Sequence, residues 1–130
     1  MVVLTLRTDK PEAEISLYSD SRKLTRVSWH ADRKLAETIH IQLRAMLEAQ
    51  NHNFHDLEGI VVYKGPGSFT GLRIGISVAN ALADGLSIPI VATTGADWTK
   101  LGLERLAKGD NEYIALPEYG APPHITQPKK

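Results

Sequence analysis

Residues 59–75 read GIVVYKGPGSFTGLRIG, and this stretch decides the fold class. Gly59 to Tyr63 is an uninterrupted apolar run, which is typical of a central strand buried on both faces. A loop of glycines and small hydroxyl residues follows, and the sequence then continues as an apolar helix to about residue 86. A second apolar run, SIPIVA at residues 87–92, predicts another strand. Strand, helix and strand in this order predict a parallel pair with a right-handed crossover.

The flanking segments complete a three-layer α/β domain. Three short runs rich in β-branched and aromatic residues predict an antiparallel meander at residues 2–6, 14–18 and 24–29. Apolar residues at helical spacing predict an amphipathic helix from Asp32 to about Gln50. Thr94 and Asp97 have the spacing of a capping box and predict a helix through about Ala107. The order β-β-β-α-β-α-β-α predicts a mixed five-stranded sheet flanked by helices.

Composition excludes several classes of protein. The chain has 130 residues, enough for one domain with a hydrophobic core. Its formal net charge is zero, so we do not expect it to bind RNA unaided. It contains no cysteine, which excludes disulfides, thiolate metal sites and a cysteine nucleophile. No membrane segment or signal peptide is predicted, and we expect a cytoplasmic protein.

The glycine-rich loop matches neither common phosphate-binding motif. It has no final Gly-Lys-Ser/Thr, so it is not a Walker A loop. Thr70 stands where the dinucleotide fingerprint needs its third glycine. The loop is therefore predicted to be a tight turn from a buried strand into a helix, with Gly65 and Gly67 free to adopt positive φ.

The helix after the loop carries a stripe of small residues, Gly71, Gly75, Ala79 and Ala83, at intervals of four. Such a stripe lets another backbone approach closely. We expect it to face a partner, while packing against the domain's own core is the alternative. Arg73 lies in the first turn, where the helix dipole disfavours a cation, and either a bound anion or simple solvation would account for it.

No catalytic or metal-binding constellation is predicted. His52 and His55 lie in a polar connection and lack the spacing and glutamate of a zinc-protease helix. His30 and His40 have no evident carboxylate partner. Ser68 is not in a nucleophile elbow, because Pro66 precedes Gly67 and Phe69 follows.

The run KGPGSFTGLRIG, followed by a small-residue helix and IPIVATTG, resembles the signature of the TsaB (YeaZ) family. The similarity extends more loosely from Val2 to about Ala107, and residues 116–130 are similar to the family's terminal segment. The resemblance implies the actin-like, ribonuclease-H-like ATPase fold. It also implies a non-catalytic subunit of the bacterial tRNA threonylcarbamoyladenosine complex.

In that complex, the resemblance implies that the chain binds TsaD, with TsaE as an ATPase helper. TsaD transfers the threonylcarbamoyl group to the adenosine beside the anticodon, so contact with tRNA is expected only through the complex. No cofactor of its own is implied, and whether ATP or ADP lies at the interface with partner subunits stays open. Because a partner-binding helix left exposed is apolar, we expect a homodimer when the chain is alone.

Two departures from the family pattern stand out. Arg7-Thr8-Asp9 replaces an Asp-Thr-Ser-like turn after the first strand, so an arginine stands where a carboxylate could hold a nucleotide-bound metal. The chain is also much shorter than typical members. We therefore expect residues 1–110 to form the first subdomain, residues 111–130 to form an extended Pro-rich tail, and the second subdomain to be absent.

The candidate site has two parts, placed on two predicted helices and the loop. The partner-binding residues are Leu43, Leu47, Leu72, Arg73, Gly75, Ile76 and Ala79. The signature loop comprises Gly65, Pro66, Gly67, Ser68, Phe69, Thr70 and Gly71. Two alternatives remain: a small independent ATP-binding or ATPase domain that uses the glycine loop, and a self-associating scaffold unrelated to tRNA.

Overall fold

One mixed sheet with helices on both faces forms the architecture of the chain, seen in a computed structural model that describes residues 1–118. The strands are β1 (Val2–Arg7), β2 (Glu12–Ser19), β3 (Arg22–His30), β4 (Gly59–Tyr63) and β5 (Ile90–Thr93). The helices are α1 (Leu35–Ala49), α2 (Phe69–Leu86) and α3 (Trp98–Ala107), with short 3-10 turns η1 (Asp32–Lys34) and η2 (Phe54–Asp56). The predicted order of elements and the mixed five-stranded sheet are confirmed.

The sheet has the strand order β3-β2-β1-β4-β5. β1 pairs antiparallel with β2 and parallel with β4, so the meander lies at one side and the parallel unit at the other. A bulge between Leu17 and Tyr18 interrupts the β2–β3 register. All of β4 and β5 is buried, as expected for strands covered on both faces.

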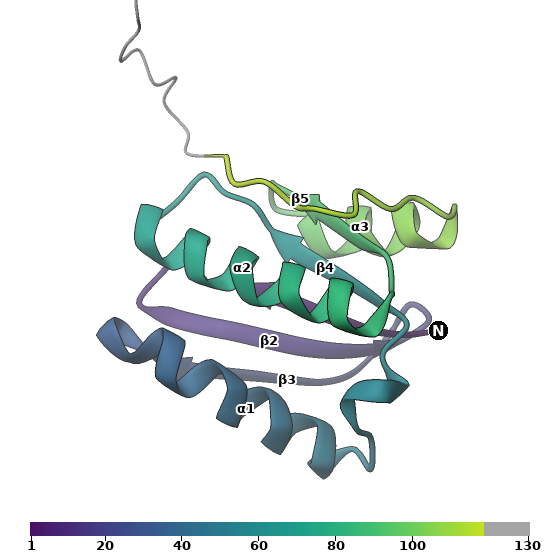
Figure 1. The fold of residues 1–130 in the computed structure, drawn as a ribbon, viewed down its shortest axis with the longest axis horizontal. Coiled ribbons are helices and arrows are strands. Elements are labelled where there is room, and N and C mark those ends of the chain that lie inside the picture. The colour runs from purple at the N-terminus through teal and green to yellow at the C-terminus, as the bar shows by residue number, and fades with distance from the viewer. Residues whose placement is uncertain (119–130) are drawn as a thin grey trace, which may run out of the picture.

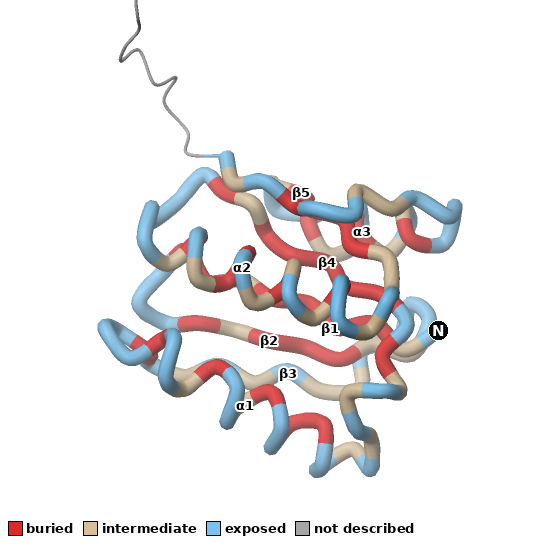
Figure 2. Tube along the Cα trace, viewed as in Figure 1, coloured by how far each residue is buried: buried red, intermediate tan, exposed pale blue. Residues whose placement is uncertain are grey.

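α1 and α2 cover one face of the sheet and α3 covers part of the other (Figure 1). The buried residues follow β1, β2, β4 and the inner sides of the helices (Figure 2). α1 contributes Leu35, Ile39, Leu43 and its last turn to this core, because apolar residues three and four apart share one side of a helix. No helix within residues 1–118 is both long and apolar enough to cross a membrane.

The predicted capping box at Thr94 and the predicted division of the chain at residue 110 have different outcomes. The capping box at Thr94 is wrong, because α3 begins at Trp98 and its N-cap Asp97 makes no side-chain cap hydrogen bond. Thr94 Oγ1 instead donates to the carbonyl of Gly65, far away in sequence. The division into residues 1–110 and 111–130 stays a prediction; residues 119–130 of the expected tail lie outside the described part of the chain.

Candidate functional site

The signature loop joins β4 to α2 and packs on the turn that follows β1. Gly65 has a φ of +112°, as the sequence led us to expect, whereas Gly67 does not adopt positive φ. Gly67 instead provides close approach, since a Cβ there would lie 2.3 Å from Cβ of Asp9. The amide of Ser68 donates to the carbonyl of Asp9 at 3.1 Å. The loop is thus held against the β1 turn by backbone contact, and no side-chain oxygen caps α2.

The first turns of α2 pack against Thr8. A Cβ on Gly71 would lie 2.1 Å from the Thr8 carbonyl oxygen, and a Cβ on Gly75 would lie 2.0 Å from Thr8 Oγ1. That hydroxyl donates to the Gly71 carbonyl at 2.7 Å. The small-residue stripe therefore faces the domain's own core, and the expectation that it faces a partner is wrong. The cause is the crossover geometry, which turns this side of α2 onto the ends of β1 and β4.

Arg7 and Asp9 form an ion pair beside the loop. Arg7 Nε lies 2.8 Å from Asp9 Oδ1, and the guanidinium carbon lies 3.9 Å from the centre of the Tyr63 ring. The hydrogen bond with Asp9 is the largest of the effects that raise the pKa of Arg7, so the arginine stays charged. Tyr63 in turn donates to the Pro66 carbonyl at 3.1 Å and packs edge-on against Trp98. The Asp9 side chain is only 6% exposed, and its carboxylate is occupied by Arg7.

This pairing decides what the loop can bind. A nucleotide-bound metal would need a free carboxylate at the end of β1, and the acidic side chain there already has an arginine partner. No group of His, Cys, Asp or Glu that could hold a metal ion occurs among residues 1–118. The residues present therefore do not fit a metal–nucleotide complex at this loop.

The predicted partner-binding residues need correction. All but Arg73 are buried in the domain's own core: Leu43, Leu47, Leu72, Gly75, Ile76 and Ala79. Their side chains cannot touch a partner while the chain is folded, because the same apolar stripes that identify the two helices also attach them to the sheet. Arg73 is exposed, and its guanidinium lies 5.2 Å from the centre of the Phe69 ring.

The accessible surface of the same helices is a groove between α1 and α2. Its volume is about 460 Å³. Its lining comprises Ala36, His40, Phe69, Thr70, Arg73, Ile74, Ser77 and Val78. We call this set the helix-pair surface. Sequence reasoning missed most of it, although the signal was present: these positions lie on the sides of the two helices that the buried stripes leave free.

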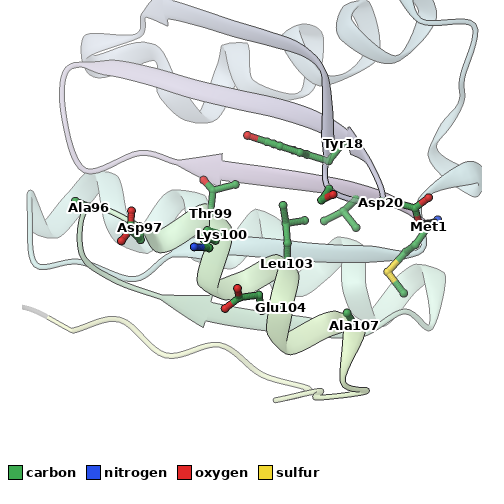
Figure 3. Close-up of a pocket in the computed structure, with 12 residues that line it drawn as sticks. Met1, Tyr18, Asp20, Ala96, Asp97, Thr99, Lys100, Leu103, Glu104 and Ala107 are labelled. Atoms are coloured by element: carbon green, nitrogen blue, oxygen red, sulfur yellow. Dashed lines mark hydrogen bonds and ion pairs between the residues drawn. The ribbon is translucent and has the colours of Figure 1, made fainter.

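A larger groove lies on the opposite face of the sheet, between α3 and the β2–β3 turn (Figure 3). It measures about 740 Å³ and has an apolar floor that includes Val3 and Leu103. Tyr18 and Lys100 lie on either side of it (Figure 3). None of the predicted site residues lines this groove, and the carboxylates around it do not form a metal-binding group.

Comparisons with known proteins show what the chain is similar to. Residues 28–99 match the family model described as TsaD: tRNA N6-adenosine threonylcarbamoyltransferase. The tRNA N6-adenosine threonylcarbamoyltransferase of Geotalea daltonii is 30% identical over 141 residues, covering 96% of this chain and 41% of the relative. The tRNA threonylcarbamoyladenosine biosynthesis protein TsaB of Bacillus subtilis is 55% identical over 61 residues, covering 47% of this chain and 24% of the relative.

Among solved structures, YeaZ from Pseudomonas aeruginosa superposes with a TM-score of 0.66 at 28% identity. The match covers 72% of this chain and 43% of that one. The resemblance to TsaB (YeaZ) and the actin-like, ribonuclease-H-like fold are confirmed. The chain spans less than half the length of these relatives.

Proposed function

The chain belongs to the family that the TsaD model describes, tRNA N6-adenosine threonylcarbamoyltransferase, and we propose that within it the chain has the role of TsaB. In this role it is a non-catalytic subunit that binds TsaD and supports transfer of the threonylcarbamoyl group to the adenosine next to the anticodon. It acts in the larger complex with TsaE and meets tRNA only there. When no TsaD is present, the surface that would bind TsaD joins two copies of the chain in a homodimer.

One observation carries the choice of a partner subunit over an enzyme. The carboxylate at the end of β1 is buried and paired with Arg7 at 2.8 Å, so the glycine-rich loop lacks a free acidic group. The same pair speaks against the alternative of an independent ATP-binding or ATPase domain. ATP or ADP at a joint interface with partner subunits remains compatible with the proposal, because partner residues would then supply the missing groups.

We propose the helix-pair surface as the place where TsaD binds. It presents Phe69 at 52% exposure beside the partly exposed Ile74 and Val78. Protein interfaces commonly combine a core of such apolar side chains with a polar rim, here His40, Ser77 and Arg73. α3 is separated from this surface by the whole sheet and serves as the control face.

Capture from the native host tests the proposal. Tagged chain is expressed in its own organism, and the proteins retained with it are identified by mass spectrometry. We expect TsaD to be retained by the unaltered chain and to be depleted when Ser77→Arg places a long cation in the middle of the helix-pair surface. Retention of TsaD at equal yield by both forms would rule out this surface, and absence of TsaD from both would rule out the proposed function.

A further inference from the structure

Side chains, rather than another strand, close the β5 edge of the sheet. β5 is the outermost strand, so alternate residues direct their backbone N–H and C=O groups away from β4. Residues 110–118 run alongside this edge (Figure 1), and Arg105 of α3 also reaches it, donating to the Ala92 carbonyl. Within the described chain, both backbone groups of Ile90 and both of Ala92 find partners there.

Three of these four hydrogen bonds have side-chain partners and one has a backbone partner. The Ile90 amide donates to Asn111 Oδ1 at 3.1 Å, and the Ile90 carbonyl accepts from the Glu112 amide at 2.8 Å. The Ala92 amide donates to Glu112 Oε2 at 2.9 Å, and the Ala92 carbonyl accepts from an Arg105 terminal nitrogen at 3.3 Å. Three residues thus supply what a sixth strand would supply.

These partners are themselves fixed in position. Arg105 bonds Glu112 Oε2 at 2.7 Å and Asp110 Oδ2 at 3.1 Å, so one guanidinium joins α3 to the start of the segment. Farther along, the side-chain amide of Asn80 exchanges hydrogen bonds with the backbone of Ala115 at 3.0 and 2.8 Å. The contact between segment and edge is therefore anchored from two helices.

The two edges of the sheet differ in how they resist pairing with another chain. β3, at the other edge, carries the cations Arg22, Lys23 and Arg26, and charged side chains are a common protection of exposed edges. β5 reads IVAT and has no charge of its own. An uncharged apolar edge with free backbone groups is a template for strand addition, so the hydrogen-bond partners of β5 are its protection.

We propose that Arg105, Asn111 and Glu112 form an edge clamp that prevents a second copy of this chain from pairing its β5 with this one. A second copy fits the edge because two IVAT strands related by a two-fold axis present the same apolar residues and the same outward groups to each other. This pairing is separate from the helix-pair surface, and the inference does not rest on the proposed function.

The test opens the clamp in a chain whose helix-pair surface is already blocked by Ser77→Arg. Asn111→Ala with Glu112→Ala removes both side-chain acceptors. Hydrogen exchange should then accelerate about tenfold at the amides of Ile90 and Ala92, as expected when a protecting hydrogen bond is lost. Light scattering should show a concentration-dependent rise from monomer to dimer. Glu118→Ala is the matched control, because it removes a carboxylate from the same segment without removing a partner of β5. The Glu118 carboxylate is half exposed and lies 3.8 Å from the Lys64 ammonium.

Two results would overturn the inference. Unchanged exchange at Ile90 and Ala92 would show that the side chains do not protect the edge, and faster exchange without a dimer would show that the edge does not accept a second copy. If the amide of Leu4, in the central strand of the sheet, also exchanges faster in the double variant, that variant has lost its fold. The single variants then test the inference. Glu112→Gln keeps an oxygen acceptor for the Ala92 amide and should stay monomeric, whereas Glu112→Ala should dimerise; equal behaviour of the two would contradict the clamp.

Discussion

At the scale of single residues, the glycines of α2 serve the chain's own packing. Gly75 allows the helix to lie directly on Thr8, whose hydroxyl is bonded to the Gly71 carbonyl. This contact fixes the start of α2 and, through it, the orientation of the helix-pair surface. The glycines of the family signature therefore shape the surface from below, while Phe69, Thr70, Arg73 and Ile74 of the same run line it.

A methyl group at Gly75 tests this contact. Gly75→Ala would place Cβ 2.0 Å from Thr8 Oγ1, so the helix must shift or the hydroxyl must move, and overpacking of this kind costs about 1–3 kcal/mol of unfolding free energy. Gly85→Ala in the same helix is the control, because nothing lies within 4 Å of its added Cβ. It should stabilise the chain by up to about 1 kcal/mol. Urea unfolding measures both, and equal effects would contradict the Thr8 contact.

The ion pair of Arg7 with Asp9 leads to a prediction about ATP hydrolysis. Because its guanidinium occupies the Asp9 carboxylate, the purified chain should not hydrolyse ATP, nor should it transfer a threonylcarbamoyl group alone. Phosphate release is measured with magnesium and ATP in excess, against a heat-treated sample. Turnover well above that sample would revive the ATPase alternative.

At the scale of elements, the sequence predicted every strand and helix in the right order, because periodicity and apolar runs are local signals. Gly59–Tyr63 agrees in both bounds, while β2 and β3 each begin two residues before the predicted run and end one residue after it, in polar turns. The stripe on α2 was located correctly, but the sequence did not reveal which surface it faces. Tertiary pairings such as Gly75 with Thr8 and Ala92 with Glu112 join distant residues and leave no local pattern.

The connection from α1 to β4 gives a pH-dependent prediction. The backbone amide of Asn53 and the His52 ring both bond Asp56 and hold the pKa of that carboxyl below its ordinary value. A lowered pKa means that the stabilisation is present above the ordinary carboxyl range and is lost as pH falls through the lowered value. Asp56→Asn should therefore melt at lower temperature than the unaltered chain at pH 7.

The difference in melting temperature should shrink as pH falls below the ordinary carboxyl range and through the lowered pKa of Asp56, because the protonated carboxyl then resembles the amide. Asp84→Asn is the control, since that side chain is exposed on α2 and forms no hydrogen bond or ion pair within residues 1–118; it should show no comparable trend. A difference between Asp56→Asn and the unaltered chain that does not depend on pH would mean that the charge of Asp56 is irrelevant to the turn.

At the scale of the whole molecule, the lobe has two unlike faces and two unlike edges. α1 and α2 form a continuous helical face with a groove, whereas α3 covers the opposite face only in part (Figure 1). The β3 edge is charged and the β5 edge is clamped. With both edges protected, the helix-pair surface and the groove beside α3 are the apolar surfaces that the described residues offer a partner, and the proposal assigns TsaD to the first of them.

Titration of TsaD from the same organism into the purified chain tests whether the helix-pair surface binds it. Calorimetry compares the unaltered chain with Ser77→Arg on α2 and with Leu101→Arg, which adds the same side chain at an exposed position of α3. We predict saturable binding by the unaltered chain and by Leu101→Arg, and affinity weaker by at least tenfold for Ser77→Arg, or about 1.4 kcal/mol, with unchanged melting temperature. Equal affinity of all three forms, or loss of binding with Leu101→Arg alone, would contradict the account.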